Sequence, residues 1–394
     1  MRQFNLKVLL ILSLGHMTTD IYQGALPAIL PFLKERLSLS YTTAGIIMMA
    51  SSFTSSIVQP LFGFFSDRKE KPALLPMGSL FAAVGFSLLA FAPNYAIVLF
   101  LVVVSGLGIA SFHPEGFKTA YFFTGRRMAT GMSIFTVGGN LGFALGPIIA
   151  LSVITHLGFS YLPLILFPAV IFLSVLGLNW KFISIPKARE KGPQEKDSGG
   201  VKRLPAPLVI LIGTVIMRSW IHAGLMTYIP FYYIDHLKGD PVFVGKLISA
   251  FLMGGVVGTI AGSPLADRWG HKNYLVISLL LTSVLLPVIF FVNGAALFAT
   301  LAVLGMVLIS TFTVTIVMAQ QILPRNLGIA SGLMVGFAIG TGGVGVTILG
   351  IVADNFGVPT AIKSIALLPV LGLLLSLSLR YPAAAGEKNG AAGK

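Results

Sequence analysis

The chain has 394 residues, of which 55% are hydrophobic and only 10% are charged, and its mean hydropathy is +0.90. A soluble domain carries about 25% charged residues, so this composition excludes a water-soluble protein and indicates a polytopic membrane protein. The net charge of +14 does not indicate a nucleic-acid partner, because the basic residues lie in short clusters between apolar runs. The chain has no cysteine, which excludes disulfides and cysteine-ligated metals.

Twelve membrane-spanning helices are predicted, each with roughly the 20 apolar residues that a bilayer crossing requires. In chain order they cover residues 6–33, 41–66, 73–92, 95–121, 127–156, 159–182, 206–234, 242–266, 272–292, 295–322, 326–354 and 357–380. The polar stretch KAREKGPQEKDSGGVKR, between the sixth and seventh spans, is typical of a flexible linker. The expected organisation is an N-terminal six-helix bundle (1–186), a cytoplasmic linker (187–205), a C-terminal six-helix bundle (206–382) and a disordered tail (383–394).

The distribution of Lys and Arg predicts the orientation of these helices. With both termini placed in the cytoplasm, the cytoplasmic ends and loops hold 21 Lys and Arg residues, whereas the outer loops hold four. Loops rich in Lys and Arg remain on the cytoplasmic side of a membrane. We therefore expect a multi-pass protein with both termini in the cytoplasm.

Short motifs recur in the two halves at a spacing of 200 residues. GFFSDRKEKP follows the second span, and SPLADRWGHK follows the eighth. The pairs at this offset are Asp67 and Asp267, Arg68 and Arg268, Gly45 and Gly245, and Gly24 and Gly224. We expect an all-α protein with two parallel, pseudo-symmetric six-helix repeats that are related by an axis along the membrane normal.

The duplicated loops are predicted to act as latches. In each loop an Asp at a helix end stands beside an Arg, so the pair can bridge neighbouring helix ends in one state and separate in another. A basic anchor on the cytoplasmic side explains either loop alone, but the duplication favours a latch. The candidate latch residues are Asp67, Arg68, Asp267, Arg268 and Arg127.

Two predicted helices carry ionisable side chains in their apolar middle. GHMTTDIYQG places His16 and Asp20 four residues apart on one face of the first helix, about 15 and 21 Å from its predicted start. In the seventh helix, MRSWIH places Arg218 and His222 four residues apart at a similar depth. Such residues are costly in a membrane and normally face a cavity or a partner.

Two interpretations of these charges remain open. A static ion pair between Asp20 and Arg218 would be structural. Alternatively, Asp20 carries a transported proton while Arg218 binds an anionic group of the substrate. Arg218 corresponds to Thr18 at the repeat offset, so the spacing does not decide whether the two charges face each other.

The fourth helix adds further polar candidates. FHPEG places His113 and Glu115 about 27 and 30 Å from Tyr95, towards the cytoplasmic end. Glu115 is interpreted as a second proton site, as a latch to Arg126 or Arg127, or as a helix-end carboxylate without a role. The candidate proton-coupling residues are Asp20, His16, Glu115 and His113. The candidate substrate-binding residues are Arg218, His222, Asn140, Tyr228 and Gln320. The glycine-rich runs of the fifth and eleventh helices are predicted close-packing surfaces.

The paired loops resemble the conserved loop motif of the major facilitator superfamily. GHMTTDIYQG, SSIVQPLFGFFSDR, GLGIASFHPEG and VGGNLGFALGP further resemble the fosmidomycin-resistance group of bacterial transporters. This resemblance implies twelve helices, alternating access and proton-driven export of small, often anionic compounds, as in drug efflux and antibiotic resistance. We expect a monomer in the bacterial inner membrane that needs no cofactor.

Three other functions compete with proton-coupled export. Proton-coupled uptake of an organic anion fits the same residues. A divalent-metal transporter would use the His, Asp and Glu side chains, but His113 is predicted to lie nearer the cytoplasmic end than the other histidines, and a central Arg218 would repel a cation. An intramembrane enzyme is not indicated, because the chain has no H-E-x-x-H, G-x-S-x-G or Walker A motif.

Overall fold

Helices make up all the regular structure in the computed structural model, which describes residues 4–67, 72–124, 128–183, 205–323, 330, 333–338 and 340–381. Across these ranges there is no strand. The α-helices are α1 (Leu6–Leu37), α2 (Tyr41–Ser52), α3 (Gln59–Asp67), α4 (Leu74–Ser87), α5 (Tyr95–Phe123), α6 (Met128–Leu157), α7 (Phe167–Leu178), α8 (Ala206–Pro230), α9 (Pro241–Trp269), α10 (His271–Val288), α11 (Gly294–Ile309), α12 (Thr311–Ile322), α14 (Gly342–Phe356), α15 (Val358–Ser364) and α16 (Leu367–Ser378). Short π segments are η1 (Phe53–Ile57), η5 (Phe231–His236) and η6 (Leu333–Ala338), and short 3₁₀ segments are η2 (Leu88–Phe91), η3 (Phe159–Leu166) and η4 (Trp180–Phe182).

The predicted membrane spans have helical counterparts. Ten helical segments within the described ranges are long and apolar enough to cross a membrane. The eleventh predicted span corresponds to the shorter apolar helix α14, and the first to the 32-residue α1, whose middle contains the polar GHMTTD stretch. The expected all-α membrane fold is confirmed.

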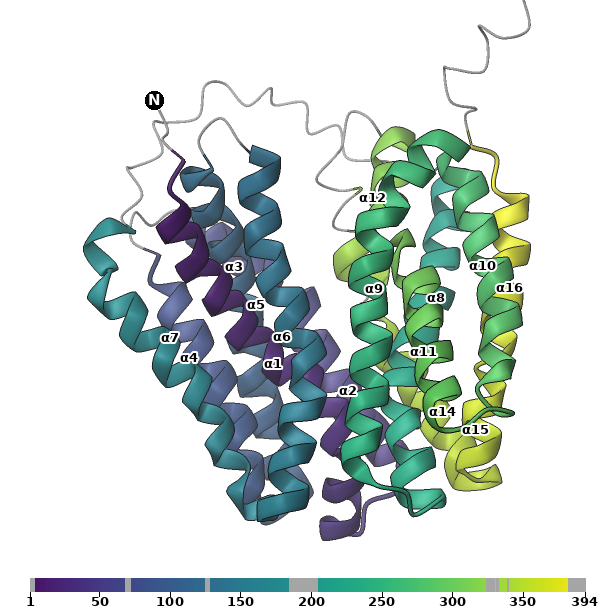
Figure 1. Cartoon of the computed structure of the whole chain (residues 1–394), viewed down its shortest axis with the longest axis horizontal. Helices are drawn as coiled ribbons and strands as arrows, with labels where there is room; N and C mark the ends of the chain where they lie inside the picture. The colour runs from purple at the N-terminus through teal and green to yellow at the C-terminus, as the bar shows by residue number, and fades with distance from the viewer. Residues whose placement is uncertain are drawn as a thin grey trace, which may run out of the picture. The chain divides into compact units, whose positions relative to one another are not determined.

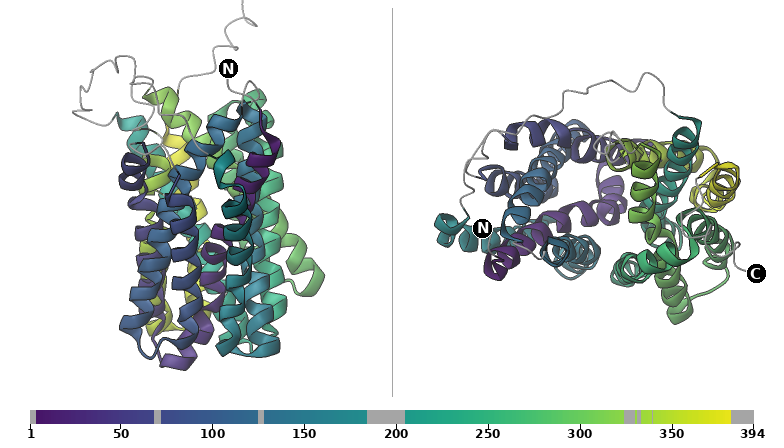
Figure 2. Two further views of the ribbon diagram at one scale, coloured as in Figure 1. Left: turned by 90° about the vertical axis from the view of Figure 1, so that its left-hand side faces the viewer. Right: turned by 90° about the horizontal axis from the view of Figure 1, so that it is seen from above.

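The described chain divides into two compact units, and their helices are seen end-on in the right-hand view of Figure 2. Unit 1 comprises described residues within 1–198, 223–250 and 340–362, and unit 2 comprises those within 199–222, 251–339 and 363–394 (Figure 1). Two segments of the predicted C-terminal bundle thus pack with the N-terminal helices. The units therefore do not coincide with the predicted division near residues 187–205, and that division stays a prediction.

Glycines related by the 200-residue offset make equivalent contacts within unit 1. A Cβ atom added to Gly45 in α2 would meet the backbone of Thr347 in α14. A Cβ atom added to Gly245 in α9 would meet the backbone of Pro147 in α6. Positions 147 and 347 are themselves 200 residues apart, so both partners of each contact follow the sequence repeat. Small residues allow helices to approach closely in membranes, and this contact is made twice.

The glycine-rich face of α6 brings its backbone against α1, which confirms the predicted close packing of this helix. Cβ atoms at Gly138, Gly142 and Gly146 would overlap main-chain carbonyl oxygens of α1. A Cβ atom at Gly139 would instead overlap the imidazole ring of His16. The glycines of α6 therefore determine both how closely α1 approaches and where the His16 ring lies.

Replacing Gly142 by alanine is expected to destabilise unit 1. Its Cβ atom would overlap the Met17 carbonyl group, a backbone contact that no rotamer change relieves, and overpacking of this kind costs about 1–3 kcal/mol. The matched control is Gly177→Ala in α7, where nothing lies within 4 Å of the added atom. Thermal unfolding in detergent should show a lower midpoint for Gly142→Ala alone. Equal midpoints for the two variants would contradict the close packing of α1 on α6.

Candidate functional site

His16 and His113 lie at the same level of unit 1, contrary to the sequence prediction that His113 lies nearer the cytoplasmic end. The Asn5 amide at the start of α1 donates to the Phe123 carbonyl at the end of α5, with an N–O distance of 2.9 Å. His113 is ten residues before Phe123 and His16 is ten residues after Leu6, so both lie about 15 Å from this end. The prediction was wrong because it measured the depth of His113 from the opposite end of a long helix.

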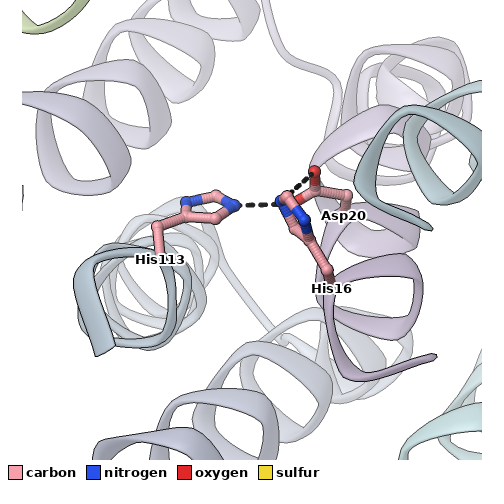
Figure 3. A group of neighbouring side chains, drawn as sticks. All are labelled: His16, Asp20 and His113. Atoms are coloured by element: carbon pink, nitrogen blue, oxygen red, sulfur yellow. Dashed lines mark hydrogen bonds and ion pairs between the residues drawn. The ribbon is translucent and has the colours of Figure 1, made fainter. Parts of the chain in front are cut away.

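Three side chains from α1 and α5 meet at this level (Figure 3). His113 Nε2 lies 2.9 Å from Asp20 Oδ1. His16 Nε2 lies 3.3 Å from Asp20 Oδ2. The three side chains are at most 12% exposed. The His16–Asp20–His113 triad therefore holds a buried carboxylate between two imidazoles.

Helices α6 and α3 hold the two imidazole rings. His16 stacks on the Phe135 ring with centroids 4.2 Å apart, and its Nδ1 lies 2.9 Å from the Phe135 carbonyl oxygen. His113 Nδ1 lies 3.4 Å from Gln59 Nε2, and this amide nitrogen also donates to the Ser55 carbonyl group at 2.6 Å. The sequence analysis did not identify Gln59 as a site residue, because a single amide side chain in a mixed polar and apolar stretch forms no recognisable motif.

The triad has two chemical capacities. A carboxylate in contact with two imidazoles can accept and release a proton. The three ligand atoms also lie within 4.8 Å of one another, as a two-histidine, one-carboxylate metal site requires.

Glu115 lies outside the triad. Residues two apart on a helix do not share a face, so Glu115 points away from His113. Its fully buried carboxylate lies 3.8 Å from Lys118 Nζ, one turn further along α5. Lys118 also donates to the Ser66 carbonyl group in α3. The predicted latch partners Arg126 and Arg127 lie outside the described residues.

Arg218 and His222 lie on α8 in unit 2. The Arg218 side chain is buried, with 6% of the residue exposed, and its guanidinium carbon is 5.4 Å from the centre of the Phe312 ring. Among the described residues no hydrogen-bond acceptor lies within reach of its Nε. The His222 ring lies 5.6 Å from the ring of Phe251. Within the described part of the chain, Nε of this buried guanidinium group is therefore left without an acceptor.

The remaining candidate substrate residues are dispersed. Tyr228 is fully buried in unit 1 and donates to the Val346 carbonyl oxygen at 3.3 Å, so it connects α8 to α14. Asn140 is half-buried on α6, directly after Gly139. The side chain of Gln320 in α12 lies outside the described residues.

The latch residues are described only in part. Asp67 is the last residue of α3 and Asp267 lies in the last turn of α9, which places both at helix ends as expected. Their side chains, and all of Arg68 and Arg127, lie outside the described residues. Arg268 is exposed. The latch stays a prediction.

A polar cluster that sequence analysis missed lies at the opposite end of unit 1 from Asn5, where α1 ends and α2 begins. Asp354 of α14 accepts hydrogen bonds from the amides of Tyr41 and Thr42, at 2.8 and 2.9 Å, and from the Thr42 hydroxyl at 2.5 Å. Asp235 accepts from the Tyr41 hydroxyl at 2.6 Å and lies 3.3 Å from Lys34 Nζ. We call Lys34, Tyr41, Thr42, Asp235 and Asp354 the far-end clasp.

The far-end clasp joins residues from the two halves of the sequence. Asp354 stabilises the first turn of α2, because a carboxylate accepts hydrogen bonds from free amides at a helix N-terminus and favours the positive end of its dipole. In the sequence, the clasp is indicated only by opposite charges: Lys34, Asp235 and Asp354 lie at the predicted outer ends of their helices.

Comparisons with known proteins agree with this fold. The sequence profile of the Major Facilitator Superfamily matches residues 12–245 and 211–394. YfnC of Bacillus subtilis, an uncharacterised MFS-type transporter, is 35% identical over 94% of this chain and 92% of its own length. The fosmidomycin resistance protein of Escherichia coli is 31% identical over 92% of this chain and 90% of its own. The crystal structure of a mutant of the nucleoside transporter NupG covers 95% of this chain and 100% of its own, with a TM-score of 0.79 and 14% identity.

Proposed function

Because the chain belongs to the major facilitator superfamily, we propose that it is a proton-coupled secondary transporter that exports small anionic or amphiphilic compounds by alternating access. The observation that carries this proposal is the buried contact of Asp20 with two histidines in the middle of α1. Buried ionisable groups in membrane helices commonly belong to proton or ion pathways. The protein works in this proposal as a monomer in the bacterial inner membrane, with both termini in the cytoplasm.

The triad supports proton coupling because its members favour different protonation states as their surroundings change. Burial penalises an isolated carboxylate, whereas a neighbouring imidazolium or N–H donor stabilises it. A movement that separates α1 from α5 would remove the His113 contact and favour the protonated acid. The helix contacts that change in alternating access therefore determine when Asp20 takes up its proton.

Alternating access requires a closure at each end of the protein. The far-end clasp supplies the closure at one end, which we place on the outer side from the excess of Lys and Arg in the other loops. The loops that contain Asp67 and Asp267 supply the closure on the cytoplasmic side in this proposal. Opening of the clasp and of the loops would alternate.

Replacing Asp354 by alanine is expected to open the far end. The change removes three hydrogen bonds to a charged acceptor. Each is worth about 1.5–3 kcal/mol, so the population of the state that is closed at this end should fall at least tenfold. A cysteine introduced at the fully buried Ala44 of α2 should then react about tenfold faster with a membrane-impermeant maleimide; the chain has no other cysteine. The control is Asp240→Ala, since the amides that donate to the Asp240 carboxylate in the described part of the chain belong to the first turn of α9, which directly follows Asp240. Equal labelling rates in both variants would refute the clasp.

The substrate class is proposed from Arg218. A buried guanidinium group is charged at any physiological pH and binds a carboxylate or phosphonate through two parallel hydrogen bonds. His222 and Phe312 would contact the rest of such a substrate, with Asn140, Tyr228 and Gln320 as further candidates. The relative named as a fosmidomycin resistance protein supports export of a compound foreign to the cell.

The proposed function is tested with purified protein in liposomes that enclose a pH-sensitive dye. Fosmidomycin, organic anions, amphiphilic cations and divalent metals are added in turn, and a substrate-dependent movement of protons is measured. Counter-movement of protons and an anion supports export, whereas co-movement identifies an uptake symporter. If substrate moves down an imposed substrate gradient and the pH inside the liposomes does not change, proton coupling is refuted.

A divalent-metal transporter is the second candidate, and the spacing of the three ligand atoms in the triad favours it. The sequence argument against it relied in part on a separate position for His113, which was wrong. The metal arm of the liposome assay decides between the two: metal flux that is lost in His113→Ala and kept in His156→Ala would favour this candidate.

A further inference from the structure

The protons on the two imidazoles of the triad follow from their outer contacts. His16 Nδ1 faces the Phe135 carbonyl oxygen at 2.9 Å. A carbonyl oxygen only accepts hydrogen bonds, so Nδ1 carries a proton. In neutral His16 the other nitrogen, Nε2, is therefore an acceptor, and it faces Asp20 Oδ2.

The same reasoning gives the opposite result for His113. Gln59 Nε2 donates to the Ser55 carbonyl group, which fixes the orientation of the Gln59 amide. The second N–H of this nitrogen is then available to His113 Nδ1, 3.4 Å away. Nδ1 therefore accepts, and in neutral His113 the proton is on Nε2, which donates to Asp20 Oδ1.

The two rings are thus not equivalent towards Asp20. His113 is a donor while neutral, but neutral His16 and ionised Asp20 would place two acceptors 3.3 Å apart. One added proton, on either His16 Nε2 or Asp20, converts this repulsion into a hydrogen bond. We propose that Gln59 is a positioning residue that holds neutral His113 with its proton on Nε2, as a hydrogen-bond donor to Asp20. This inference rests on the proposed proton coupling.

The charged groups around the triad do not alter this assignment. On α5, Glu115 and Lys118 pair with each other at 3.8 Å. On α1, Lys7 and residues 34–36 lie near the helix ends. The described parts of α2, α3, α4, α6 and α7 bring no Lys, Arg, Asp or Glu side chain to the triad, and His156 lies in the last turn of α6.

The fold places Gln59 at this contact through a break in the second membrane span. Segment η1 (Phe53–Ile57) has π-helical hydrogen bonding, and α3 begins at Gln59, one residue beyond the end of this segment. A π turn contains an extra residue and rotates the following side chains by about 100° relative to an uninterrupted α-helix. Segments of this type occur frequently at functional sites.

The experiment is nitrogen NMR of the full-length protein with ¹⁵N-labelled histidine in lipid nanodiscs, which needs no substrate. Each ring nitrogen reports whether it carries a proton. The chain has six histidines, and the signals of the two triad rings are identified by their loss in His16→Phe and His113→Phe. His156 is an internal reference, because its Nδ1 faces the Ser152 carbonyl oxygen at 2.9 Å and must carry a proton. At alkaline pH, His16 should show the pattern of His156, and His113 the opposite pattern.

Two substitutions then test Gln59. Gln59→Glu places an acceptor against His113 Nδ1 and should move the His113 proton to Nδ1. Gln59→Leu should leave a mixture of both tautomers at His113 and no change at His16.

A wild-type His113 with its proton on Nδ1, or a His113 pattern that is the same in the wild type and in both variants, would overturn the proposal. If Gln59→Leu does not fold, the wild-type spectrum and Gln59→Glu still decide. The proposed transport function fails separately: correct tautomers without proton movement in liposomes would refute proton coupling and leave the role of Gln59 intact.

Discussion

Replacing Asp20 by asparagine is expected to abolish transport driven by a proton gradient while exchange of substrate without a gradient continues. Asparagine preserves the size of the side chain, and its carbonyl oxygen can still accept from His113 Nε2. It cannot take up a proton, so the His16–Asp20 contact loses its exchangeable site. Gradient-driven flux in liposomes should fall at least a hundredfold, and the rate of exchange should change by less than about threefold, since no charge-assisted bond to substrate is removed.

The matched control for this prediction is Glu115→Gln, which neutralises a second buried carboxylate, located in α5. Glu115 lies on a different face of the helix and pairs with Lys118, so we expect this variant to keep most of its gradient-driven flux. Loss of coupling in Glu115→Gln and normal coupling in Asp20→Asn would instead assign the proton to Glu115, the other carboxylate among the proton-coupling candidates from the sequence.

Replacing Arg218 is expected to weaken substrate binding in a way that depends on the shape of the replacement. Lysine keeps the positive charge but loses the planar arrangement of donors, and glutamine loses the charge as well. A charge-assisted hydrogen bond contributes about 1.5–3 kcal/mol, so Arg218→Lys should weaken binding of an anionic substrate roughly tenfold and Arg218→Gln roughly a hundredfold. Binding is measured by calorimetry with the purified protein and the anion found in the liposome screen.

The control for Arg218 is Lys363→Gln, which removes a positive charge from an exposed position in the last turn of α15. This variant should bind as tightly as the wild type. If Arg218→Lys and Arg218→Gln both insert correctly and bind the substrate as tightly as the control does, the anion site is elsewhere and Arg218 has a structural role.

The sequence alone determined the membrane class, the helical spans and the existence of a repeat. These features depend on residues that are close together in the sequence. A span requires a continuous apolar run, and residues four apart share one face of any helix. His16 and Asp20 were therefore placed together correctly before any fold was known. The 200-residue offset also predicted equivalent positions, and Gly45 and Gly245 make equivalent contacts in the folded chain.

Only the tertiary structure decided which helices meet at the site. His113 joins Asp20 because α5 is antiparallel to α1 and the two helices are aligned by the Asn5–Phe123 hydrogen bond, whereas a count along one helix cannot give the level of its neighbour. Gln59 reaches His113 through a π segment that hydropathy does not reveal. The far-end clasp joins residues more than 190 positions apart. Contacts of this kind depend on the rotation and level of each helix, which packing of the whole unit sets and no local pattern encodes.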